Sequence, residues 1–180
     1  MNDETGVTRA VQEGDVESFR LLVQRYQKPV IRMIRNLIND HHVCEDIAQD
    51  VFLAAYKKLA SFDPARSSFS TWLFTIARNK SINAIKKKRT PSVGNPPENP
   101  DLFSPVDALI QDELSVKLEQ ALEALSPRHR RAFILAEFEN LPYEQIAQIE
   151  GARIGTIKSR ISRAKNRLRS ALGGLDGDMS

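Results

Sequence analysis

Cysteine, histidine and tryptophan are scarce in this chain of 180 residues, which has 1 Cys, 3 His and 1 Trp. A single cysteine excludes an internal disulfide and fits a reducing compartment. No stretch approaches the run of about 18 apolar residues that a membrane span requires. Residues 1–20 are polar and acidic, and so lack the basic and then apolar pattern of a secretory signal. The sequence therefore predicts a cytoplasmic protein.

The usual signs of an enzyme active site are also missing. We find no Gly-rich phosphate loop, no paired-carboxylate site and no nucleophile with a matching base. His41, His42 and Cys44 are predicted to lie in a short connector, where they could pack in a loop or at a helix start, or supply imidazole and thiolate ligands to zinc. No fourth ligand is evident, however, and the third histidine, His129, is far along the chain. We therefore predict no catalytic residue, no metal site, no cofactor and no small-molecule substrate.

The most informative stretch is Tyr143 to Leu172, YEQIAQIEGARIGTIKSRISRAKNRLRSAL. Its apolar residues recur at spacings of three and four, which predicts two helices around a turn at Gly151. The second helix is expected to bury a stripe of Ile154, Ile157, Ile161, Ala164 and Leu168. The opposite face is polar and cationic. This layout is typical of a helix-turn-helix whose second helix enters the major groove of DNA. The cationic face carries Thr156, Lys158, Ser159, Arg160, Ser162, Arg163 and Arg167, with Lys165 and Arg169 further along.

Charge is distributed unevenly along the chain. Residues 141–172 carry 7 Lys and Arg against 2 Asp and Glu, and residues 62–90 carry 7 against 1. The acidic stretch between them, residues 91–125, carries 1 against 7. A charged helix face is most often simply solvated. Two cationic blocks separated by an acidic connector nevertheless favour two contacts with nucleic acid, since Lys and Arg neutralise phosphates.

The first cationic block combines aromatic rings with a basic helix, which we expect from about Trp72 to Lys88 with Ser70 or Thr71 as its cap. Rings beside a cationic helix suit single-stranded nucleic acid, because they stack on unpaired bases while the charges hold the backbone. The alternative is that Phe69 and Trp72 belong to the core. Arg78, Asn79 and Asn83 are expected to face outward on this helix. The two asparagines lie one turn apart on the basic face and could read base edges. Other members of this block are Phe62, Phe74, Lys86, Lys87, Lys88 and Arg89.

Apolar spacing predicts an all-α protein of two small helical domains. We expect the first domain to cover residues 1–90 and the second to cover residues 112–172, with a tail at 173–180. A flexible linker at 91–111 is predicted because this stretch is rich in proline and acidic residues. The expected helices cover residues 7–38 with a break at Pro29, then 45–61, 72–88, 112–125 and 128–138, before the helix-turn-helix.

Taken as a whole, the chain resembles a bacterial sigma factor of the extracytoplasmic-function type, in the sigma-70 family. Three blocks carry the resemblance: DIAQDVFLAAYKKLASF, FSTWLFTIARNKSINAIKKKR and LEALSPRHRRAFILAEFENLPYEQIAQIEGARIGTIKSRISRAKNRLR. It implies that the first domain is sigma region 2, which binds core RNA polymerase and reads and melts the minus-10 promoter element. The second domain would be region 4, which reads the minus-35 element as duplex DNA. An anti-sigma factor, often membrane-anchored, and a role in an extracytoplasmic or stress response are also implied.

The resemblance further implies roles for individual residues. Core polymerase would be bound by Asp46, Gln49 and Asp50, with Leu53 beside them off the buried stripe. A pocket for a base flipped out of the non-template strand would be shaped by Phe62, Phe74, Ile76 and Asn79, with Asn83, Lys86, Lys87, Lys88 and Arg89 nearby on the DNA. Groove-facing residues of region 4 would be Lys158, Ser159, Ser162 and Arg163.

Three residues depart from the family pattern. Pro142 replaces the serine that usually caps the first helix of the motif, so the start of that helix must depend on the fixed φ of proline. Glu150 replaces an apolar residue, and Arg153 replaces a proline and adds a candidate phosphate contact.

Two other functions stay open. A stand-alone helix-turn-helix regulator would bind duplex operator by itself, usually as a dimer, and a nucleic-acid-processing enzyme would need a carboxylate cluster on the basic surface.

Overall fold

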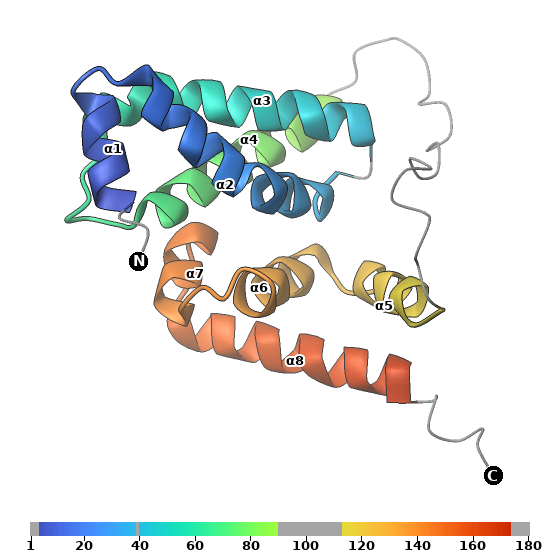
Figure 1. Cartoon of the computed structure of the whole chain (residues 1–180). Helices are drawn as coiled ribbons and strands as arrows, with labels where there is room; N and C mark the ends of the chain where they lie inside the picture. Colours follow the sequence, from blue (N-terminus) through green and yellow to red (C-terminus); the bar gives the residue numbers. More distant parts are fainter. Residues whose placement is uncertain (1–3, 39, 90–112, 174–180) are drawn as a thin grey trace.

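The computed structural model describes residues 4–38, 40–89 and 113–173 (Figure 1). Those residues form helices and no strand, which confirms the all-α prediction. The predicted linker, residues 91–111, and residues 174–180 of the predicted tail lie outside the described residues. The elements are α1 (Glu4–Gln12), α2 (Val16–Arg35), α3 (His41–Lys58), the 3-10 turn η1 (Leu59–Ser61), α4 (Phe69–Arg89), α5 (Glu113–Glu123), α6 (Pro127–Glu137), α7 (Tyr143–Glu150) and α8 (Ile154–Leu172).

Helix α2 begins at a cap and continues through a proline. The carboxylate of Asp15 accepts hydrogen bonds from the backbone N–H groups of Glu17 and Ser18, as the Gly-Asp pair before the helix predicts. The predicted break at Pro29 is wrong, because α2 runs unbroken from Val16 to Arg35. Val30 next to it is fully buried, so packing of the apolar stripe offsets the backbone hydrogen bond that proline cannot make.

The start of α3 corrects a second prediction. His41, His42 and Cys44 do not lie in a connector but form the first turns of α3, which Asp40 caps by accepting from the N–H of Val43 at 3.1 Å. Cys44 is fully buried, and its Sγ lies 3.1 Å from the carbonyl oxygen of Ile38. Within the described ranges there is no group of three or more His, Cys, Asp or Glu that could hold a metal ion.

Helix α4 begins earlier than predicted, at Phe69. Ser70 and Thr71, the predicted caps, lie inside the helix. Ser68 takes that role instead: its hydroxyl accepts from the N–H of Thr71 at 3.2 Å. The helix therefore starts early enough to bring Thr71 and Arg78 onto the side that meets α7.

The N-terminal helices α1–α4 and the C-terminal helices α6–α8 pack against each other, mainly through α4 and α7 (Figure 1). One continuous apolar core spans both halves and includes Phe74 of α4 and Ile146 of α7. A smaller cluster joins α5 to α8. Polar contacts cross the same boundary, among them a hydrogen bond of 3.1 Å from the Thr71 hydroxyl to the Gln145 side chain. No helix in the described part of the chain is long and apolar enough to cross a membrane.

Candidate nucleic-acid and polymerase interfaces

The helix-turn-helix forms where the sequence predicts it. Ile157, Ile161, Ala164 and Leu168 make the buried stripe of α8, while Ile154, predicted to share it, is 40% exposed because it begins the helix. Helix α7 ends at Gly151, whose φ of 59° is the left-handed conformation that glycine adopts at no steric cost. Pro142 precedes α7 with a φ of −58° and makes no side-chain capping bond, as expected.

The cationic face of α8 is turned to solvent. Arg160 is the exception: its side chain is 17% exposed, and Nη1 lies 3.4 Å from Oε2 of Glu150. The other predicted minus-35 residues on and before the helix are all exposed: Arg153, Thr156, Lys158, Ser159, Ser162, Arg163 and Arg167. These exposed side chains can contact a macromolecule, and their cationic and hydroxyl groups suit phosphates and base edges.

Glu150 is the centre of a buried charge cluster that the sequence did not reveal. Its side chain is 1% exposed, and Arg131 donates to both carboxylate oxygens, at 2.8 and 2.9 Å. Arg160 donates a third contact, and Nε of Arg78 lies 3.7 Å from Oε1. Arg78 belongs to α4, so the cluster joins the two halves. The prediction that Arg78 faces outward is therefore wrong in this structure.

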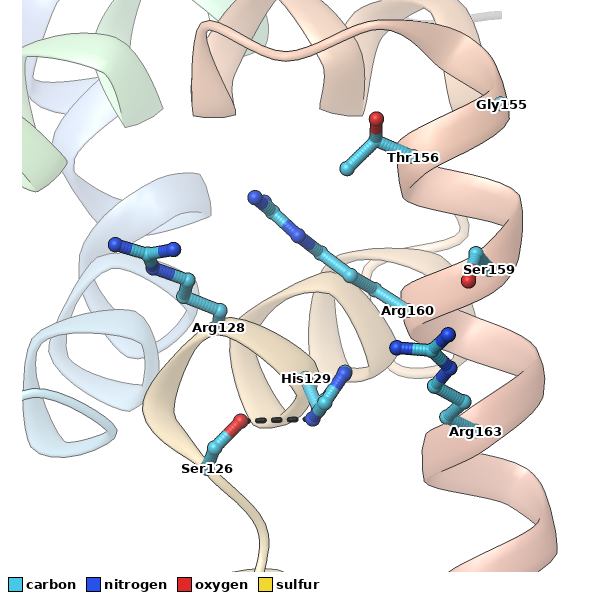
Figure 2. Close-up of a pocket in the computed structure, with 8 residues that line it drawn as sticks. All are labelled: Ser126, Arg128, His129, Gly155, Thr156, Ser159, Arg160 and Arg163. Atoms are coloured by element: carbon cyan, nitrogen blue, oxygen red, sulfur yellow. Dashed lines mark hydrogen bonds between the residues drawn. The ribbon is translucent and has the colours of Figure 1, made fainter.

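A cavity of about 580 Å³ lies between the start of α6 and α8 (Figure 2). Ser126, Arg128 and His129 line it from α6, opposite Thr156, Ser159, Arg160 and Arg163. Nδ1 of His129 is 2.7 Å from the Ser126 hydroxyl. Partial burial, followed by the positive charges of Arg167, Arg163 and Arg160, lowers the pKa of His129 below its ordinary value of 6.5. Sequence reasoning missed the three α6 residues, and the only available signal was the run of basic residues after Pro127.

The predicted minus-10 residues fall into a buried group and an exposed group. Phe62 is 7% exposed and Phe74 is 1% exposed, so both rings belong to the core, where Phe62 packs at a tilt against Trp72 with a centroid distance of 5.2 Å. Phe69 is also buried, which confirms the alternative interpretation for that ring. Ile76 is half-buried. Asn79, Asn83, Lys86 and Lys87 are exposed, while the side chains of Lys88 and Arg89 lie outside what the structure describes.

The predicted polymerase-binding residues lie together on the solvent face of α3. Asp46, Gln49 and Asp50 are exposed, and Leu53 is 52% exposed. Tyr56, one turn further along, is 42% exposed. The exposed residues of α3 therefore include both carboxylates and large apolar side chains, which are available for contact with another protein.

Comparison with known proteins decides the family. The profile for Sigma-70 region 2 matches residues 22–90, and that for Sigma-70, region 4 matches residues 115–168. The RNA polymerase sigma-H factor of Pseudomonas aeruginosa is 34% identical over 174 residues, which cover 90% of each protein. The ECF RNA polymerase sigma factor SigW of Bacillus subtilis is 32% identical over 91% of this chain and 94% of the relative. This chain belongs to the extracytoplasmic-function sigma factors of the sigma-70 family.

A solved structure gives the same result for the fold. The sigma factor RpoE of Bartonella quintana, in complex with the anti-sigma factor NepR, is 30% identical and superposes with a TM-score of 0.68. The match covers 91% of this chain and 99% of that chain. As a sigma factor, the present chain directs bacterial RNA polymerase to specific promoters and initiates transcription. Regions 2 and 4 bind core polymerase and the minus-10 and minus-35 elements.

Proposed function

We propose that this sigma factor uses three separate binding surfaces: α3 binds core polymerase, α4 contacts the melted minus-10 strand, and α8 reads the minus-35 duplex. Residues 1–90 then act as region 2 and residues 112–172 as region 4. The observation that carries the proposal is the two-sided character of α8, whose apolar stripe is buried while its basic face is open to solvent. Because the basic face is already exposed, α8 can enter a major groove while its apolar stripe stays buried.

At the minus-35 element, Lys158, Ser159, Ser162 and Arg163 would face the groove. Arg can donate two parallel hydrogen bonds to a guanine, and a Ser or Thr hydroxyl can donate to or accept from a base edge. Arg153 and Thr156 lie at the start of α8 and would bind backbone phosphates, together with Arg167 near its end. Arg160 would contribute from the same face while it remains bonded to Glu150.

At the minus-10 element, the exposed amides of Asn79 and Asn83 would read the edges of unpaired bases, and Lys86, Lys87, Lys88 and Arg89 would hold the backbone. Removal of a base from the stack costs a few kcal/mol, so a shaped pocket is required. Phe62, Phe74 and Ile76 would form the apolar floor of that pocket. Phe62 and Phe74 are buried in the core, and Ile76 is half-buried.

At the polymerase, Asp46, Gln49 and Asp50 would make the polar contacts and Leu53 the apolar one. The NepR complex of the Bartonella relative supports a second partner for this chain, an anti-sigma factor. In our proposal this anti-sigma factor covers the polymerase-binding surface of α3, in either a soluble or a membrane-anchored form. We place the chain in the cytoplasm, as a regulator in an extracytoplasmic or stress response rather than an enzyme.

Run-off transcription tests the proposal. Purified bacterial core polymerase would be combined with the wild-type chain or with the single variants Asp50→Ala, Asn79→Ala and Lys158→Ala on candidate promoters. We expect initiation to require the chain and to fall with each variant. Gln24→Ala and Arg20→Ala, both exposed on α2, are matched controls and should leave initiation unchanged.

Binding assays separate the three surfaces. Asp50→Ala should weaken binding to core polymerase in the absence of DNA, whereas the other two variants should weaken only promoter binding by the holoenzyme. If the chain gave no initiation but bound duplex DNA specifically by itself, a stand-alone helix-turn-helix regulator would become the better description. Normal core binding and initiation by all three variants would show that the residue assignments are wrong.

A further inference from the structure

The cavity between α6 and α8 has the composition of an anion-binding site (Figure 2). Guanidinium groups of Arg128, Arg160 and Arg163 line it, together with the hydroxyls of Ser126, Thr156 and Ser159. Its lining, among the described residues, contains no carboxylate, although Nη1 of Arg160 lies 3.4 Å from Oε2 of Glu150. Arg donors are arranged as a fork that matches phosphate oxygens. Because the side chains come from two helices, the site depends on the tertiary fold and not on α8 alone.

The start of α6 adds to this positive environment. Ser126 is the N-cap residue, but its side chain makes no capping hydrogen bond and contacts the ring of His129 instead. The positive end of the α6 dipole is therefore not capped by a side chain. Figure 2 shows the guanidinium of Arg163 on the side of α8 nearest His129, whereas the side chain of Arg160 extends across the cavity and away from Ser126 and His129.

His129 is the titratable group of the cavity. Its Nδ1 is held at Ser126, and its other ring nitrogen points away from Ser126 toward the α8 side (Figure 2). The charged groups that act on it are Arg160, Arg163 and Arg167 of α8, and Arg128 lines the same cavity from its own helix. Partial burial, and then these positive charges, disfavour the imidazolium in the free protein. A phosphate placed among them would reverse this preference, because an opposite charge nearby favours the protonated ring.

We propose that Ser126, Arg128 and His129 bind a backbone phosphate of the minus-35 duplex together with Arg160 and Arg163, and that His129 takes up a proton on binding. The inference rests on the proposed role of α8. Ser159 and Arg163 line the cavity and also belong to the proposed minus-35 surface. A duplex seated on that surface carries its sugar-phosphate backbone along the groove edge, so a phosphate is the anion available there.

Proton uptake makes duplex affinity depend on pH. Between the pKa of His129 in the free chain and its higher pKa in the complex, binding strengthens as the pH falls. One linked proton changes the affinity by at most about tenfold per pH unit. His129→Gln keeps a polar side chain at this position but cannot titrate, so its duplex affinity should lose this part of the pH dependence.

NMR titration of the histidine rings tests the proposal directly. The full 20.3 kDa chain would be titrated with and without a random-sequence DNA duplex at low salt, since phosphate contacts do not require a particular sequence. The chain has only 3 histidines, so the signals can be assigned by substitution. We expect the pKa of His129 to rise on duplex binding. His41 and His42, at the start of α3, serve as internal controls and should not respond.

Salt dependence supplies a second readout. Arg128→Gln should weaken duplex binding and reduce the slope of log affinity against log salt by about one, whereas Arg20→Gln on α2 should change neither. If the duplex binds and Lys158→Ala weakens it, but the His129 pKa and the Arg128→Gln slope do not change, the phosphate site is refuted and the minus-35 surface stands. If the duplex does not bind, or binds equally well without Lys158 and Arg163, the proposed function of α8 fails as well.

Discussion

Replacement of Glu150 by leucine should strongly destabilise this sigma factor. The carboxylate is 1% exposed and accepts two bonds from Arg131, itself only 6% exposed. Leucine would fill a similar volume but leave the Arg131 guanidinium buried without its acceptor. Arg160 and Arg78, at 3.4 and 3.7 Å from the carboxylate, would then add like-charge repulsion.

The magnitude follows from the burial of the pair. Removal of one partner from a buried ion pair costs about 3–5 kcal/mol, because the remaining charge is neither solvated nor paired. For a chain of this length, each kcal/mol lowers the melting temperature by about 2–4 °C. We therefore expect Glu150→Leu to lower the melting temperature by roughly 6–20 °C. An exposed ion pair would contribute less than about 1 kcal/mol.

Thermal and urea unfolding, followed by far-UV circular dichroism, measure the effect. Glu144→Leu is the matched control, because Glu144 is an exposed glutamate on the same helix and should change stability by less than about 1 kcal/mol. The double variant Glu150→Leu, Arg131→Met removes both charges of the main pair. It should recover most of the loss, since a buried ion pair can be replaced by apolar side chains of similar volume at little cost.

Two results would contradict this reasoning. If Glu150→Leu were no less stable than Glu144→Leu, the Glu150 carboxylate would not be buried against Arg131 in solution. If the double variant were as unstable as Glu150→Leu, the loss would come from leucine packing or from the other two arginines, and not from the orphaned Arg131 charge.

Three further predictions concern pH, the turn and the contact between the halves. Burial raises the pKa of Glu139 above its ordinary value of 4.5, so the free energy of unfolding should fall as the pH rises from 4.5 through the raised pKa. Glu139→Gln should remove this fall, which urea unfolding at several pH values measures. Gly151→Ala should cost about 1–2 kcal/mol because φ is positive there, whereas Gly155→Ala, inside α8 with open space around it, should gain about 0.5–1 kcal/mol in thermal melts. A double-mutant cycle of Thr71→Val and Gln145→Leu should give a coupling of about 0.5–1.5 kcal/mol, and zero coupling would show that the two halves do not touch at this point in solution.

The sequence alone predicted most of the helical elements and predicted which helix would bind DNA. Ile157, Ile161 and Leu168 recur with the period of a helix, and this repeat is a local property that does not depend on the rest of the fold. Gly151 in the turn and the basic residues opposite the stripe completed the helix-turn-helix. Local signals were less reliable at helix ends, where one side-chain bond decides the start: Ser68 rather than Ser70 caps the start of α4.

Only the tertiary structure decided which charged side chains and aromatic rings are exposed to solvent and can contact a ligand. Periodicity shows that a helix has an apolar face, but it does not show which distant residue meets the other face. Arg78 therefore read as a solvent-facing cation although it lies beside Glu150, which is 72 positions further along and pairs with Arg131 on yet another helix. Phe62 is buried for the same reason, and the His129 cavity exists only because α6 packs on α8. Contacts of this kind depend on how helices pack in space, and a short sequence window does not contain that information.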